Sequence, residues 1–234
     1  MKTIGLIGGM TPQSTILYYQ VLNDLATQLF GEKHSCKVVI SSVNFGELSE
    51  LQSKGRWDLL DEMMAEEGKR LEAAGVSCIL ITANTMHLCI EAVEKAVSVP
   101  VIHIAEATAK AIHEKGLTKV ALLGTKYTME KTFYTDVLSR ENIETIIPEQ
   151  EDRDLIHDVI YRELAKGTIN PESKALYLKI IDKLILQGVQ GIILGCTEIP
   201  MLISQADVEV PTFDTTTIHA KAGFQFITAS SQRK

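Results

Sequence analysis

The chain has 234 residues, of which 45% are hydrophobic and 23% are charged, a composition typical of a globular rather than a disordered protein. Its formal net charge of −7 and its pI near 5.4 argue against nucleic acid or an anionic membrane as a partner. No apolar run approaches the roughly 20 residues that span a bilayer, and the apolar run at the N-terminus is too short for a signal peptide. We therefore expect a cytoplasmic protein with one large domain or two small ones.

Short apolar runs alternate with longer amphipathic stretches along the chain. The runs are continuously apolar, which predicts parallel strands covered on both faces. Strands are predicted at residues 3–8, 37–43, 77–82, 99–104, 119–124, 191–195 and 210–213. Helices are predicted between them, among others at residues 58–74, 106–115 and 173–187. This alternation predicts the α/β fold class with mostly parallel sheets.

The chain also repeats itself. Residues 2–19 align with 118–134, residues 75–85 with 188–198, and residues 99–111 with 210–222. Three matches in one order favour two pseudo-symmetric three-layer domains, although unrelated βα units can also look alike. We expect the first domain at residues 1–97 plus 211–234 and the second at 98–210. Because ligands bind beyond the carboxyl ends of parallel strands, an active site is expected in the cleft between these domains.

Two matching corners follow the strands predicted at 77–82 and 191–195. The first reads Ala83-Asn84-Thr85 and the second reads Cys196-Thr197-Glu198. Each is expected to lead into a helix, whose unpaired N–H groups would hold a carboxylate; the alternative is that the polar residues only cap the helices. A helix N-terminus also lowers the pKa of a thiol, so Cys196 is predicted to be functional.

The other cysteines, Cys36, Cys78 and Cys89, are predicted to be buried and structural. Their spacing matches neither a metal site nor a disulfide framework.

With "GLIGGM", "ANTMH", "LLGTKYTME" and "LGCTEIP" in this order, the sequence resembles the aspartate/glutamate racemases, which are cofactor-independent amino-acid racemases. The resemblance implies two α/β domains that each contribute one cysteine. One cysteine removes the α-proton of the amino acid and the other donates a proton to the opposite face. It implies no pyridoxal cofactor and no metal, and it makes a homodimer the expected assembly.

The resemblance also assigns roles to single residues. Cys196 is the acid/base of the second half, and Glu198 beside it orients the thiol, carries its proton, or only completes the helix start. The remaining positions bind substrate. Asn84, Thr85 and Thr197 hold the α-carboxylate, Met10 and Thr125 line the cleft, and Gln52 and Lys166 match the positions that bind a side-chain carboxylate.

Three further residues are expected to have lesser roles. His87 is expected to form hydrogen bonds within its helix. Asp214 and His219 open the last helix, where the resemblance implies an indirect contribution to the site.

Two positions depart from the family pattern. Gln52 stands where more familiar aspartate racemases have an arginine, which weakens the case for a strictly acidic substrate. Ala83 stands where the first catalytic thiol belongs, and an alanine carries no proton. The leading interpretation is an aspartate/glutamate-type racemase that is impaired or one-sided. The alternatives are a single-cysteine decarboxylase of malonate-type acids and a non-catalytic protein that binds small carboxylates.

Overall fold

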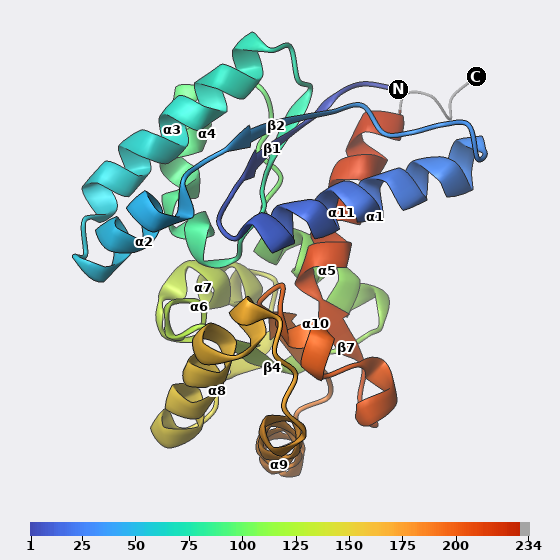
Figure 1. Cartoon of the computed structure of the whole chain (residues 1–234). Coiled ribbons are helices and arrows are strands. Elements are labelled where there is room, and N and C mark those ends of the chain that lie inside the picture. Colours follow the sequence, from blue (N-terminus) through green and yellow to red (C-terminus); the bar gives the residue numbers. More distant parts are fainter. Residues whose placement is uncertain (230–234) are drawn as a thin grey trace. The chain divides into compact units, whose positions relative to one another are not determined.

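The computed structural model describes residues 1–229, which form two parallel sheets with helices around them (Figure 1). The strands are β1 (Ile4–Gly8), β2 (Val38–Ser42), β3 (Cys78–Ile81), β4 (Lys119–Gly124), β5 (Glu144–Ile146), β6 (Ile192–Gly195) and β7 (Thr212–Asp214). The α-helices are α1 (Pro12–Phe30), α2 (Phe45–Ser53), α3 (Trp57–Ala73), α4 (Ile90–Ala96), α5 (Ile104–Glu114), α6 (Lys126–Glu130), α7 (Thr132–Arg140), α8 (Gln150–Arg162), α9 (Pro171–Leu186), α10 (Ile199–Leu202) and α11 (Thr215–Thr228). Short 3₁₀ helices are η1 (Thr85–Cys89), η2 (Leu164–Lys166) and η3 (Gln205–Asp207).

The chain divides into two compact units. Unit 1 contains Met1–Ile104 and the segment from Thr216 onward, and unit 2 contains Ala105–Thr215. The domain limits expected from the sequence stay a prediction, and residues 230–234 of the expected first domain lie outside the described residues. Within residues 1–229, no helix is both long and apolar enough to cross a membrane.

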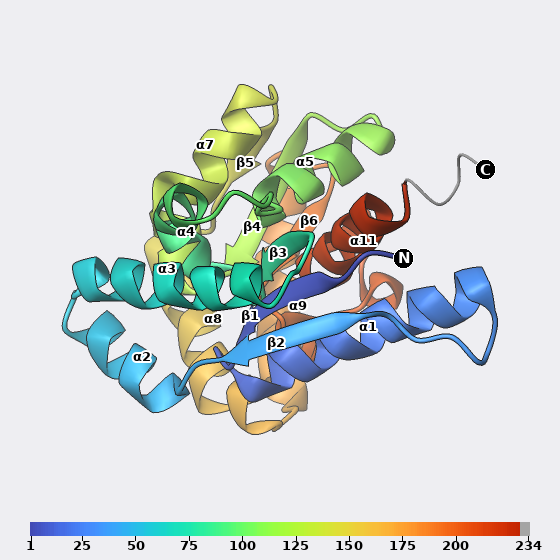
Figure 2. The same ribbon diagram turned by 90° about the horizontal axis from the view of Figure 1, so that it is seen from above.

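Unit 1 is built on a three-stranded parallel sheet of order β2-β1-β3 (Figure 2). Successive residues of a strand point to opposite faces. Ile7 and Ile81 therefore pack into a core with α3 and α4, whereas Leu6 and Leu80 pack into a second core with α1 and α11. Each of these buried side chains stabilises the unit by about 1.5–3 kcal/mol through apolar burial. The result is a sheet between two helical layers.

Unit 2 is built on a four-stranded parallel sheet of order β5-β4-β6-β7. Leu123 and Leu194 on one face pack with residues of α8 and α9, where the Tyr177 hydroxyl donates to the Ile156 carbonyl at 3.0 Å. The residues that alternate with them, such as Leu122, are also fully buried. Both faces of this sheet are therefore covered, which confirms the predicted α/β class with parallel strands.

The internal repeat corresponds to equivalent elements in the two sheets. β1 lies between β2 and β3, and β4 lies between β5 and β6 in the same way. Helix α5 begins at Ile104 and helix α11 begins at Thr215, so these helices keep the 111-residue offset of the matching sequences. The chain passes from one unit to the other next to these two helix starts.

The prediction of a strand at residues 99–104 is wrong. This segment forms a single parallel bridge, between Val101 and Ile79, and α5 already begins at Ile104. Pro100 lacks the N–H that would extend the ladder, and the early helix start leaves no room for further pairs. The segment still lies beside β3, as β7 lies beside β6, because the Ile102 N–H donates to the Ile79 carbonyl at 2.9 Å.

Two other strands also differ from the prediction. β5 was not predicted, because it has only three residues and no continuous apolar run. β7 covers Thr212–Asp214 rather than residues 210–213, because Pro211 again lacks a donor for the ladder.

Candidate functional site

The first corner, defined here as residues 82–85, joins β3 to η1. Thr82 is fully buried, and its hydroxyl donates to the Ile7 carbonyl of β1 at 3.1 Å. The Ser14 hydroxyl of α1 in turn donates to the Thr82 carbonyl. These hydrogen bonds fix the backbone on which the half-buried Ala83 lies.

The loop between β1 and α1 borders the same end of the sheet. Gly9 has a φ of +87°, and a Cβ at this position would lie 2.2 Å from the Val43 carbonyl oxygen, so only glycine fits. Its N–H donates to the Thr15 hydroxyl at 2.8 Å. Met10 follows and packs in the same apolar core as Met86 of η1. The predicted residue Met10 thus lies near the first corner.

Gln52 of α2 is also brought to the first corner. Its side chain is buried, and its Nε2 donates to the Met86 sulfur at 3.2 Å, a weak acceptor. Asn84 is buried and Thr85 is half-buried. Unit 1 therefore groups the predicted residues Met10, Gln52, Ala83, Asn84 and Thr85.

The second corner, defined here as residues 195–198, joins β6 to α10. The Cys196 thiol donates to Glu198 Oε2 at 2.9 Å, and the Thr197 hydroxyl donates to the same oxygen at 2.6 Å. Thr197 and Glu198 are both buried. An ionised carboxylate is an acceptor only, so these two donors fit a negatively charged Glu198.

The expectation that a helix N-terminus lowers the pKa of the Cys196 thiol is wrong. Removal from water raises the pKa of this thiol well above its usual value, and the charge and hydrogen bond of Glu198 raise it further. Helix α10 begins only at Ile199 and has four residues, so its dipole is weak. The neighbouring carboxylate outweighs it, and the resting thiol is protonated.

Thr125 lies beside the second corner by strand register. Gly124 of β4 pairs with Gly195 of β6, so Thr125 and Cys196 directly follow paired residues on adjacent strands. The Thr125 hydroxyl caps α6 by accepting from the Thr128 N–H at 3.3 Å. Lys166 lies at the end of η2 and is exposed. Unit 2 therefore contains the predicted residues Thr125, Lys166, Cys196, Thr197 and Glu198.

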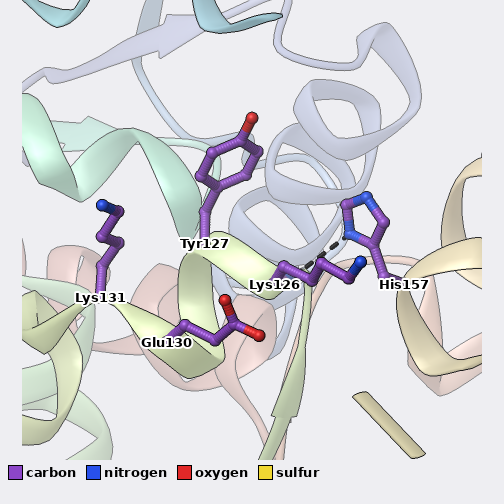
Figure 3. Close-up of a pocket in the computed structure, with 5 residues that line it drawn as sticks. All are labelled: Lys126, Tyr127, Glu130, Lys131 and His157. Atoms are coloured by element: carbon purple, nitrogen blue, oxygen red, sulfur yellow. Dashed lines mark hydrogen bonds between the residues drawn. The ribbon is translucent and has the colours of Figure 1, made fainter. Parts of the chain in front are cut away.

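A pocket of about 220 Å³ opens next to Thr125 in unit 2, with Lys126, Tyr127, Glu130, Lys131 and His157 around it (Figure 3). The Lys126 N–H donates to His157 Nδ1 at 3.2 Å, and the Lys126 ammonium pairs with Asp154 at 2.7 Å. The side chains of Tyr127 in α6 and of Lys131, directly after α6, extend in a similar direction (Figure 3). A pocket of this size has room for a small molecule or for several water molecules.

Tyr161 of α8 links this pocket to the second corner. Its ring lies 4.7 Å from that of His157, measured between centroids. Tyr161 is partly exposed, but partial removal of its hydroxyl from water, followed by the charges of Cys196, Tyr127 and Glu198, raises its pKa to about 12. The hydroxyl of Tyr161 therefore stays protonated near pH 7, although it interacts with the Cys196 thiol. The sequence carried no signal for Tyr161 or His157, because both lie on an ordinary amphipathic helix.

Two buried histidines lie behind the first corner in unit 1. His87 Nδ1 lies 3.0 Å from the Ala83 carbonyl oxygen, and His219 Nε2 lies 2.7 Å from the Ile102 carbonyl oxygen. Burial lowers the pKa of His219 to about 3. Burial, with smaller effects of His103 and His219, lowers the pKa of His87 well below its usual range. Both rings are therefore neutral near pH 7.

Within residues 1–229, no three His, Cys, Asp or Glu side chains gather as a metal ion would require. The polar groups of both corners are hydroxyls, amides, a thiol and a carboxylate. Such groups suit the binding of a small polar acid and the transfer of protons.

The profile of the Asp/Glu/Hydantoin racemase family matches residues 7–223. Since this match spans most of the chain, the protein belongs to that family. It is an amino-acid racemase and hence an isomerase, with the two-domain α/β fold of the family.

Individual relatives agree with this assignment. The crystal structure of a candidate Asp/Glu racemase from Yersinia pestis is 44% identical, with a TM-score of 0.92 over 97% of this chain and 99% of that chain. An aspartate racemase homologue from Pyrococcus horikoshii OT3 is 35% identical, with a TM-score of 0.86 over 97% of this chain and 100% of that chain. The broad specificity amino-acid racemase RacX of Bacillus subtilis is 25% identical over 222 residues, which is 94% of this chain and 95% of the relative.

Acid should destabilise unit 1 through its two buried histidines. Their pKa values are depressed by folding, so the unfolded chain takes up protons below about pH 6.5 while the folded rings stay neutral. The contribution of the two neutral histidines to the free energy of unfolding is fully present above pH 6.5. It is lost as the pH falls towards the pKa values that the two rings have in the folded protein. We expect the free energy of unfolding to drop by about 1.4 kcal/mol per histidine per pH unit below 6.5.

Urea unfolding at pH 5 and pH 7 measures this slope. H219Q should reduce the slope, whereas H34Q, at an exposed position, should leave it unchanged. An equal slope in H219Q and the wild type would contradict the assignment to buried histidines.

Glu198 should suppress the reactivity of Cys196. Because its carboxylate raises the pKa of the thiol, E198Q should lower that pKa and increase the thiolate fraction. We expect faster alkylation of Cys196 by iodoacetamide at pH 8, followed by peptide mass spectrometry. C196A identifies the labelled site, and T197V, which removes the other donor to Glu198, serves as a matched control. Slower alkylation in E198Q would show that the carboxylate activates the thiol in the resting protein.

Proposed function

We propose that this racemase acts on aspartate- and glutamate-type amino acids, with Cys196 as its thiol acid/base and without pyridoxal phosphate. The observation that carries this proposal is the 2.9 Å hydrogen bond from the Cys196 thiol to the buried Glu198. The carboxylate is a proton acceptor within reach of the thiol. Glu198 therefore receives the thiol proton when the reaction needs a thiolate.

The proposed steps balance in protons. The Cys196 proton moves to Glu198, the thiolate takes the α-proton of the substrate, and the electron pair of the broken C–H bond stays on the α-carbon. The thiol then returns a proton to the α-carbon and becomes a thiolate again, and Glu198 gives its proton back to Cys196, which closes the cycle. Because Glu198 holds the resting thiol protonated, the first step is unfavourable by itself; the positive α-ammonium group of the substrate favours the thiolate and offsets part of that cost.

Polar groups at both corners are proposed to bind the substrate. Asn84, Thr85 and Thr197 hold the α-carboxylate, and Met10 and Thr125 border the site. Gln52 and Lys166 are proposed for the side-chain carboxylate. An amide forms weaker hydrogen bonds to a carboxylate than a guanidinium does, so Gln52 favours a wider choice of substrates than an arginine would. RacX is itself described as a broad specificity racemase, which supports the same view.

The proposed activity is one-sided because the first corner lacks the thiol that the second corner carries. The internal repeat makes Ala83 the counterpart of Cys196, and the family resemblance assigns a thiol to both positions. Ala83 offers no proton to the opposite face of the substrate. Removal and return of the α-proton then occur at Cys196, on the face that the resemblance assigns to the L-enantiomer.

Hydrogen exchange tests this proposal. In heavy water, L-aspartate or L-glutamate should exchange its α-hydrogen at least about tenfold faster than the D-enantiomer, because only one face has a thiol. Proton NMR follows the exchange, and chiral chromatography should find slow or no net racemisation. C196S should abolish exchange, whereas C36S, which alters a buried cysteine far along the sequence from both corners, should retain it. Equal exchange of both enantiomers would overturn the one-sided mechanism, and release of carbon dioxide from an alkyl malonate would instead support decarboxylation.

Restoring the second thiol should restore racemisation. A83C adds an acid/base at the first corner, and a positioned general acid contributes about 100-fold or more to rate. We expect net interconversion of the enantiomers of aspartate to rise by about this factor, measured by circular dichroism. A83S, which is similar in size but a much weaker acid, is the matched control. No gain in A83C, with L-exchange intact, would mean that residue 83 does not reach the substrate.

A further inference from the structure

The hydrogen bonds of His87 fix its tautomer. Its Nδ1 lies 3.0 Å from the Ala83 carbonyl oxygen, which can only accept, so Nδ1 carries the proton. The Ile104 N–H donates to Nε2 at 3.2 Å, so Nε2 is unprotonated. The ring is thus a neutral bridge between the first corner and the start of α5.

The same residue also binds the corner through its backbone. The His87 N–H donates to the Asn84 carbonyl at 3.0 Å, so His87 holds two successive carbonyls, those of Ala83 and Asn84. Peptide groups are planar and trans, so a carbonyl and the N–H of the next residue point in opposite directions. Holding both carbonyls therefore sets the direction of the Asn84 and Thr85 peptides.

A second histidine secures the far side of this bridge. His219 Nε2 lies 2.7 Å from the Ile102 carbonyl oxygen and therefore donates to it. Nδ1 is then the acceptor for the Tyr18 hydroxyl at 2.8 Å. The rings of His87 and His219 meet edge to face, 5.4 Å apart between centroids. Ile102 and Ile104 are thus held by two neutral histidines just before the chain enters unit 2.

We propose that His87, as the neutral tautomer with its proton on Nδ1, is a positioning residue that sets the backbone of the first corner. Its effect on catalysis rests on the proposed function, in which Asn84 and Thr85 bind the α-carboxylate. His219, held by Tyr18, binds the Ile102 carbonyl two residues before Ile104, and the Ile104 N–H keeps the proton of His87 on Nδ1. A histidine that only satisfied its own buried nitrogens would have the same tautomer, so substitutions that remove one of its two hydrogen bonds at a time are needed to show positioning.

The tautomer is tested directly by ¹⁵N-resolved NMR of the histidine rings at pH 7. The expected result is a proton on Nδ1 of His87 and on Nε2 of His219. Protonation of His87 on Nε2, or on both nitrogens, would overturn the proposal, whatever the catalytic activity.

Two substitutions separate positioning from packing. Asparagine can place an N–H near the position of Nδ1, so H87N keeps the donor to Ala83 and loses the acceptor for Ile104. The longer glutamine reaches the position of Nε2, so H87Q keeps that acceptor and loses the donor to Ala83. We expect H87Q to speed amide hydrogen exchange at residues 84–86 by about fivefold, the effect of losing one net hydrogen bond. H87N should leave these rates unchanged.

Substrate turnover gives the second readout. H87Q should raise the KM for L-aspartate exchange about tenfold, whereas H87N should stay within about threefold of the wild type. If the amides of residues 84–86 exchange at the same rate in H87Q and H87N, whether faster than in the wild type or not, the hydrogen bond from Nδ1 does not position the first corner. If the wild type shows no L-aspartate exchange, the proposed function fails, while the ring NMR and the amide rates still decide the role of His87.

Discussion

The hydrogen bond between the Cys196 thiol and the Glu198 carboxylate is the interaction on which the proposed chemistry of this protein depends. A buried carboxylate next to a half-buried thiol opposes a second negative charge, so the resting thiol keeps its proton. The same carboxylate provides the nearest place to which that proton can move. In the proposed mechanism, the group that suppresses the thiolate in the resting protein becomes the proton acceptor once a cationic substrate changes the balance of charge.

Strand register explains how a short stretch of chain builds this arrangement. The pairing of Gly124 with Gly195 brings Thr125 and Cys196 to one edge of the sheet of unit 2. Both glycines are needed there, since a Cβ on Gly195 would lie 2.7 Å from the Leu123 carbonyl oxygen. In unit 1, β1 and β3 pair in the same parallel manner, and the Thr82 hydroxyl ties the first corner to Ile7.

Most of the fold could be predicted from the sequence, because a continuously apolar strand such as Cys78–Ile81 needs no distant information. The predictions of strands failed where the local sequence pattern and the hydrogen bonding between strands favour different structures. Residues 99–104 are apolar enough for a strand, but Pro100 and the early start of α5 reduce it to one bridge at Val101. β5 was missed because three residues, of which only Ile146 is strongly apolar, give no detectable period.

The site was less predictable, and the reason is electrostatic rather than topological. Sequence places Cys196 after a strand, but it does not reveal that the following helix has only four residues, or that Glu198 turns back onto the thiol. The same holds for His87, whose partners Ala83, Ile104 and His219 come from three separate segments. Motifs therefore suggested candidate residues, whereas the protonation states of these residues depend on contacts that only the folded chain forms. Two corners that each follow a parallel strand can thus support different chemistry, because one holds a proton on sulfur while the other presents hydroxyl, amide and peptide groups but no thiol.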